Sequence, residues 1–122
     1  MIKVYTIHDK ALKQRKEAAR GRRCNMITDK DRRNMGQFYR AVLALENEEE
    51  CRRFFDDVAT IKEVLELSAR LEVARLLDSG AVFSEISKQT GASSATISRV
   101  NKCLIYGDGG YKTVLDRLSE KE

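Results

Sequence analysis

The 122-residue sequence lacks proline and tryptophan, and it has one histidine and three cysteines. It contains no apolar run near the roughly 20 residues that a membrane-spanning helix needs. Its charged N-terminus is not followed by the apolar stretch of a secretory signal. These absences argue against transmembrane and secreted proteins. We therefore expect a cytoplasmic protein that has no membrane partner.

The cysteines and the histidine do not form a metal-binding pattern. Cys24, Cys51 and Cys103 are widely spaced and include no C-x-x-C pair, and the only histidine, His8, is not near any of them in the sequence. A structural zinc site needs about four clustered ligands. We therefore expect no metal site and interpret the cysteines as reduced intracellular thiols.

Catalytic patterns are missing as well. The sequence has no carboxylate pair, Cys–His couple or phosphate-binding glycine loop at a usable spacing. The segment Gly107-Asp108-Gly109-Gly110 has no following Lys-Ser/Thr, so its simpler interpretation is a connection between two helices. We expect neither enzymatic activity nor an obligatory cofactor.

The formal net charge of +4 is unevenly distributed along the chain. Residues 1–25 contain eight basic and two acidic residues, a net charge of +6, and few large apolar groups. The other 97 residues carry 15 basic and 17 acidic groups, a net charge of −2. We expect residues 1–25 to form a basic N-terminal arm, flexible or partly helical over Lys10–Arg20, and residues 26–122 to form a separate helical domain.

Apolar residues recur every three or four positions, which is the period of an amphipathic helix and predicts an all-α fold. A first helix carries Met35, Phe38, Val42 and Leu45 on one face, and Gly36 leaves open where that helix begins. A long third helix has apolar residues on two stripes, so we expect contacts from more than one side. The boundary signals are an Asn47 N-cap for a second helix, a Thr60–Glu63 capping box for the third, and Gly80 as its stop.

Residues 83–102 have the pattern of a helix-turn-helix. Ile86 supplies the core of the first helix, and Gly91 permits the left-handed backbone that a short turn requires. Ser93 is a suitable N-cap for the second helix, which Ile97 and Val100 pack against the first. Thr90 is the least typical position, where a larger aliphatic residue is more usual. The alternative is a packed helical corner that binds no nucleic acid.

The exposed face of the second helix favours DNA. Its side chains are mostly short and polar, which lets a helix enter the major groove and place hydroxyls and methyls against base edges. Basic residues at its edges can neutralise phosphates. The candidate DNA-binding residues are Lys88, Ser93, Ser94, Ala95, Thr96, Ser98, Arg99 and Lys102.

The stretch Thr28–Leu118 resembles the tryptophan-repressor superfamily, and specifically its YerC/YecD-type branch. The resemblance rests on the segments Phe54-Phe55-Asp56-Asp57, Arg70-Leu71-Glu72-Val73-Ala74-Arg75, Thr90-Gly91-Ala92-Ser93-Ser94-Ala95-Thr96-Ile97-Ser98-Arg99-Val100 and Cys103-Leu104-Ile105-Tyr106-Gly107. It implies a tryptophan-repressor-like helical domain, spanning residues 26–122, that forms an intertwined homodimer. The function it implies is transcriptional regulation, as a repressor that reads a palindromic operator in double-stranded DNA.

The resemblance also implies an effector site. Thr60, Arg70 and Arg99 match three positions that hold the indole ligand of the tryptophan repressor, and Cys103 stands where that protein has a serine. Val100 replaces a glycine beside the ligand and would crowd it, while a thiol is a weaker hydrogen-bonding group than a hydroxyl. We therefore do not expect tryptophan, and leave open another small aromatic or amino-acid effector. Without an effector, Arg70 can pair with Glu66 and Arg99 can contact a phosphate.

A helical protein–protein adaptor, in which the helix-turn-helix is only architectural, is the alternative function. The net charge of −2 over residues 26–122 keeps it open, because a dedicated DNA-binding domain often carries more basic charge.

Overall fold

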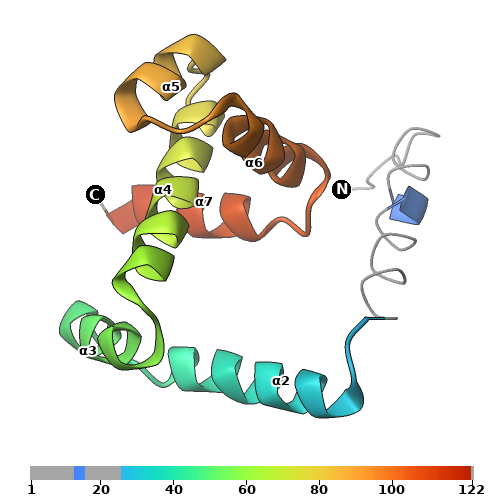
Figure 1. The fold of residues 1–122 in the computed structure, drawn as a ribbon, viewed down its shortest axis with the longest axis vertical. Helices are drawn as coiled ribbons and strands as arrows, with labels where there is room; N and C mark the ends of the chain where they lie inside the picture. The colour runs from blue at the N-terminus through green and yellow to red at the C-terminus, as the bar shows by residue number, and fades with distance from the viewer. Residues whose placement is uncertain (1–12, 16–25, 122) are drawn as a thin grey trace. The chain divides into compact units, whose positions relative to one another are not determined.

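The computed structural model describes residues 13–15 and 26–121. All regular structure in these residues is helical, which confirms the all-α prediction (Figure 1). The helices are α2 (Asp29–Leu43), α3 (Glu48–Val58), α4 (Ile61–Asp78), α5 (Phe83–Thr90), α6 (Ser94–Tyr106) and α7 (Gly110–Lys121). Within the described ranges, no helix is both long enough and apolar enough to cross a membrane.

The N-terminal arm lies mostly outside the described residues. Residues 13–15 are helical, and the rest of the expected arm over residues 1–25 falls outside the structural description. Its boundary with a domain beginning at residue 26 therefore stays a prediction.

Local capping signals set where the helices begin. Thr28 and Asp31 form a capping box at the start of α2, and Thr60 and Glu63 form another at the start of α4. Asn47 Oδ1 accepts the Glu50 N–H at 2.9 Å, as expected of an N-cap for α3. The predicted starts of the second and third helices are thus confirmed.

The chain divides into two compact units, Met1–Val58 and Ala59–Glu122. In the first unit, α2 and α3 meet through an aromatic cluster. Measured between ring centroids, Phe38 lies 5.9 Å from Phe54 and 6.4 Å from Phe55. The rings of Phe54 and Phe55 lie edge to face at 5.6 Å. Neither helix has a fully buried residue in the single chain.

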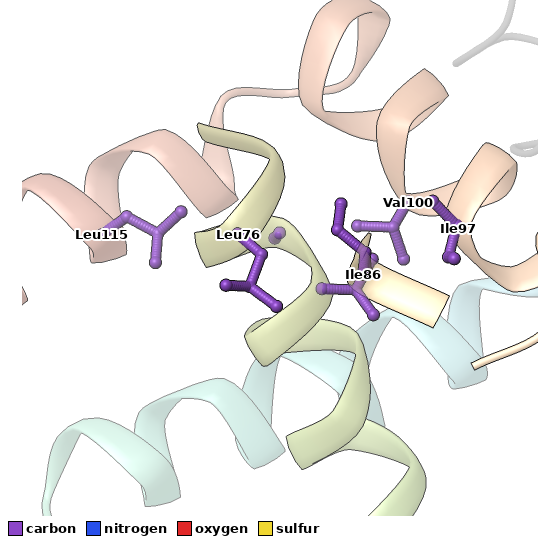
Figure 2. Packing of buried hydrophobic residues seen from close by; sticks show 7 residues of the cluster. Leu76, Ile86, Ile97, Val100 and Leu115 are labelled. Atoms are coloured by element: carbon purple, nitrogen blue, oxygen red, sulfur yellow. The ribbon is translucent and has the colours of Figure 1, made fainter. Parts of the chain in front are cut away.

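In the second unit, α4 packs against α5, α6 and α7. Figure 2 shows the buried cluster formed where these helices meet, with Ile86 from α5, Val100 from α6 and Leu115 from α7 around Leu76 of α4. The complete cluster consists of Val73, Ala74, Leu76, Ile86, Ile97, Val100 and Leu115.

Only the second half of α4 is buried in the single chain. Val73 and Ala74 are fully buried, whereas Ile61, Leu65 and Leu67 are 71%, 61% and 51% exposed. The expectation that α4 is contacted from several sides is therefore met only over its C-terminal half. An uncovered apolar half-helix is a surface that a partner can bury.

Candidate nucleic-acid interface

The helix-turn-helix is formed by α5, the turn at residues 91–93, and α6. Gly91 ends α5 in the left-handed region at φ 71° and ψ 4°, and its N–H donates to the Ser87 carbonyl at 2.9 Å. Ser93 then caps α6 by accepting the Thr96 N–H at 3.2 Å. The predicted roles of Gly91 and Ser93 are both confirmed, and α6 continues beyond residue 102 to Tyr106.

Two hydroxyl groups hold the turn together. Thr90 Oγ1 donates to the Ile86 carbonyl at 2.7 Å and accepts the Ala92 N–H at 3.2 Å. Ser87 Oγ donates to the Ala92 carbonyl at 3.1 Å. The sequence pattern made Thr90 the least typical position, but its hydroxyl pairs two backbone groups of the turn, which an aliphatic side chain could not do.

Buried side chains fix the orientation of α6. Ile97 and Val100 are 1% and 3% exposed and pack with fully buried Ile86 against α4. These positions are three residues apart on α6, so they occupy one face and leave the other for solvent. The valine at position 100 therefore forms part of the core.

The candidate DNA-binding residues lie on or beside that outer face. Thr96 is half-buried, and the other candidates are exposed: Lys88, Ser93, Ser94, Ala95, Ser98, Arg99 and Lys102. The hydroxyls of Ser93 and Thr96 lie 3.0 Å apart, within hydrogen-bond distance of each other, and the Ser93 hydroxyl also accepts the Thr96 N–H. These two hydroxyls are therefore partly used in capping α6. Ser94, Ser98 and Arg99 make none of the side-chain hydrogen bonds found within residues 26–121.

The cations of this face are unpaired within the described residues. Ion pairs neutralise Arg52, Arg75 and Lys112 elsewhere, but none in residues 26–121 involves Lys88, Arg99 or Lys102. Arg99 and Lys102 therefore add two positive charges to the exposed side of α6, and Lys88 adds a third on α5. Such charges can meet phosphates of a duplex.

The candidate effector residues are only partly brought together. Thr60 is exposed, and its hydroxyl serves the α4 capping box. Arg70 follows ten residues later on the same helix, so about 15 Å of helix axis separates the two. One chain does not place Thr60 beside Arg70.

Arg70 and Cys103 instead share a neighbour that the sequence pattern did not single out. Burial raises the pKa of the Tyr111 hydroxyl, nearby Cys103 raises it further, and Arg70 partly opposes both. Tyr111 lies at the start of α7 and packs against the buried cluster. A single tyrosine after a glycine-rich connection gave no periodic signal of this placement.

Comparison with known proteins agrees with this architecture. The model of the Trp repressor protein family matches residues 33–119. The chain is 49% identical over 90 residues to Uncharacterized protein YerC of Bacillus subtilis (strain 168), covering 74% of this chain and 86% of that protein. A solved TrpR-like protein from Eubacterium eligens ATCC 27750 has a TM-score of 0.69 and 46% identity, covering 71% and 90% of the respective chains. A solved structure from Staphylococcus aureus has a TM-score of 0.68 and 43% identity, with coverages of 70% and 86%. The chain therefore belongs to the Trp repressor protein family.

Proposed function

We propose that this protein is a sequence-specific DNA-binding transcriptional regulator that reads its operator through α6 and acts as a repressor by occlusion. The family and the structural neighbours support the coarse class of helix-turn-helix DNA-binding regulator, which is not an enzyme class. The observation that carries the finer proposal is the outer face of α6. Its short polar side chains and exposed Arg99 are held outward by buried Ile97 and Val100.

The chemistry of that face suits direct readout. Ser94 and Ser98 can donate to or accept from base edges, the Ala95 methyl can contact a thymine methyl, and Arg99 can bind guanine or a phosphate. Lys88 and Lys102 can supply further phosphate contacts, and the N-terminal end of α6, capped by Ser93, can face a phosphate of the duplex.

We further propose that the active form is a homodimer that reads a palindromic operator. The single chain leaves Leu43 of α2 83% exposed and Leu65 of α4 61% exposed, and its fully enclosed core is a cluster within the second unit. A two-fold dimer can cover such surfaces. Its two α6 helices would then meet half-sites about 34–36 Å apart.

The direct test is a gel-shift titration against DNA from upstream of the protein's own coding region. The Arg99→Ala variant should weaken operator binding by about ten- to a hundredfold, because a specific side-chain contact is worth about 1–3 kcal/mol. Arg117→Ala is the matched control, since Arg117 is another exposed arginine, on α7. Equal affinity of the unaltered protein for operator and scrambled DNA would remove the sequence-specific reading.

Regulation by a small effector is compatible with this function but is not required by it. Arg70, Arg99 and Cys103 could contact a small aromatic or amino-acid ligand, with Thr60 contributed from the other copy of a dimer. Tryptophan fits poorly because Val100 already fills the space against α4. We propose no obligatory co-repressor.

A protein–protein adaptor is the second candidate, and the net charge favours it. Residues 59–122 contain nine basic and nine acidic residues, so the unit that carries the helix-turn-helix is formally neutral. If the protein is an adaptor, salt-dependent DNA affinity should vanish once residues 1–25 are deleted. A stable complex with another protein should then persist in pull-downs.

A further inference from the structure

The outer face of α2 carries guanidinium groups that the helix-turn-helix does not use. Arg33, Gln37 and Arg40 follow one another at intervals of four and three residues, so they share a face of the helix with Gly36. Together with Arg32 they line an open surface hollow of about 350 Å³. We call these five residues the α2 arginine site.

This face points away from the packing of α2 on α3. Phe38, which contacts Phe54 and Phe55, lies on the opposite side of the helix, because α2 turns once every 3.6 residues. Arg33 and Arg40 are exposed. Packing of the aromatic cluster between α2 and α3 therefore leaves the α2 arginine site open to solvent.

Two of the three arginines of the site, Arg33 and Arg40, form no ion pair with a carboxylate among residues 26–121. The acids closest to them in the sequence have other partners, one of them Arg32 of the same site. Asp29 lies 3.4 Å from Arg32, and Asp31 accepts the Thr28 N–H at 3.0 Å in the capping box, where the Thr28 hydrogen bonds lower its pKa.

The neighbouring helix shows the opposite arrangement. On α3, Arg52 pairs with Glu49 at 2.6 Å and with Asp56 at 2.7 Å, and Arg53 pairs with Glu49 at 3.3 Å. Residues 26–58 thus contain abundant carboxylates, yet these leave Arg33 and Arg40 available for an external anion.

Gly36 adds an independent observation. It lies inside α2 without a positive φ, and a Cβ placed there would meet only the flexible Arg40 Nη1, at 3.4 Å. The backbone therefore does not need glycine, and glycine inside a helix is less stable than alanine. With glycine at this position, no side chain occupies the space between the arginine side chains.

We propose that the α2 arginine site binds phosphate groups, with the Arg33 and Arg40 guanidinium groups gripping phosphate oxygens and the Gln37 amide donating a further hydrogen bond. Planar guanidinium forks suit phosphate geometry, which a lysine ammonium would meet only as a point charge. The phosphate can belong to a nucleic-acid backbone or to a free oligophosphate. The site is separate from the helix-turn-helix and does not depend on its assignment.

The test uses the full chain and two double variants with the same change in net charge. Arg33→Gln with Arg40→Gln removes the site, and Arg52→Gln with Arg53→Gln removes the paired arginines of α3. Binding of a short scrambled duplex is measured by fluorescence anisotropy over a salt series, and binding of inorganic tripolyphosphate is measured by calorimetry. Gly36→Glu provides a third variant, which places a carboxylate between the guanidinium groups.

For a nucleic-acid backbone, the site variant should lower the slope of log K against log salt by about 1.8 for each site that contacts the duplex, since each of its two phosphate contacts contributes about 0.9. For a free oligophosphate, the salt slope of duplex binding should be the same in the site variant and the unaltered protein. Tripolyphosphate affinity should then fall at least tenfold, both in the site variant and in Gly36→Glu. In both cases the ratio of operator to scrambled affinity should not change, which separates this site from α6. Equal effects of the two double variants in both assays would overturn the proposal.

Discussion

The hydroxyl of Thr90 should stabilise the turn of the helix-turn-helix, and Thr90→Val tests this directly. Valine has nearly the same shape but can neither donate to the Ile86 carbonyl nor accept the Ala92 N–H, the two bonds that the threonine hydroxyl makes at 2.7 Å and 3.2 Å. The Ala92 N–H would lose its acceptor in a partly buried position. Leaving such a donor unsatisfied costs about 1–3 kcal/mol.

Thr113 offers a matched control on α7. Its Oγ1 donates to the Gly109 carbonyl at 3.0 Å, so it makes the same bond to the fourth residue before it as Thr90 does. Thr113 is exposed, and none of the hydrogen bonds found in residues 26–121 has its hydroxyl as an acceptor. Thr113→Val should therefore change the free energy of unfolding by less than about 0.5 kcal/mol.

The assay is thermal unfolding followed by circular dichroism at one fixed protein concentration. We expect Thr90→Val to cost about 1–2 kcal/mol more than Thr113→Val, which corresponds to roughly 4–16 °C in Tm for a domain of this size. Operator affinity should fall with Thr90→Val alone, because this turn holds α6. Equal Tm values for the two variants would refute the reasoning that the second hydrogen bond of Thr90 stabilises the turn.

Four further results are expected. Gly107→Ala should lower the free energy of unfolding by about 1–3 kcal/mol in urea titrations, because a Cβ there would clash with the Cys103 carbonyl oxygen; an unchanged midpoint would contradict this contact. Truncation to a chain beginning at Met26 should give a shallower salt dependence of DNA binding with the same sequence preference, and an unchanged slope would show that the arm does not contact DNA. Calorimetric titration of the protein with tryptophan should show no saturable binding. A saturable binding isotherm would instead make tryptophan a candidate effector. Hydrogen bonds from Arg75 lower the pKa of Glu72, so the ionised Glu72 stabilises the fold above its ordinary pKa of 4.5, and this stabilisation is lost as the pH falls below that value. Glu72→Gln should therefore reduce the drop in Tm on acidification, and identical pH profiles of Tm for the two proteins would argue against the ion pair.

The sequence predicted best those features that depend on neighbours along the chain. The capping box of Thr60 and Glu63, the cap at Ser93 and the left-handed Gly91 each involve residues within four positions of one another. Such signals are strong because the side chain must satisfy backbone groups of its own helix end. The helix-turn-helix could therefore be located from the order of its residues alone.

Features that depend on distant contacts were harder to predict. Apolar spacing indicated that α4 has a wide apolar surface. It did not indicate that a single chain buries only the C-terminal half of this helix and leaves Leu65 in the N-terminal half 61% exposed. The electrostatic influence of Arg70 and Cys103 on Tyr111 links three helices, and no local pattern encodes it. Thr90 is atypical by residue type, and residue type alone does not reveal a hydroxyl that bridges two backbone groups.

Net charge proves a poor guide to where this chain can bind DNA. The second unit is formally neutral, yet some of its acids pair with basic residues that are not on α6, such as Glu72 with Arg75 and Asp78 with Lys112. At physiological ionic strength charges are screened over about 8 Å, so a phosphate near α6 responds mainly to the nearest groups. Arg99 and its basic neighbours can then present a positive surface on a neutral unit. We therefore expect the local placement of Arg99 and Lys102 on α6, which contains no acidic residue, to matter more for a polyanion than the net charge of the unit.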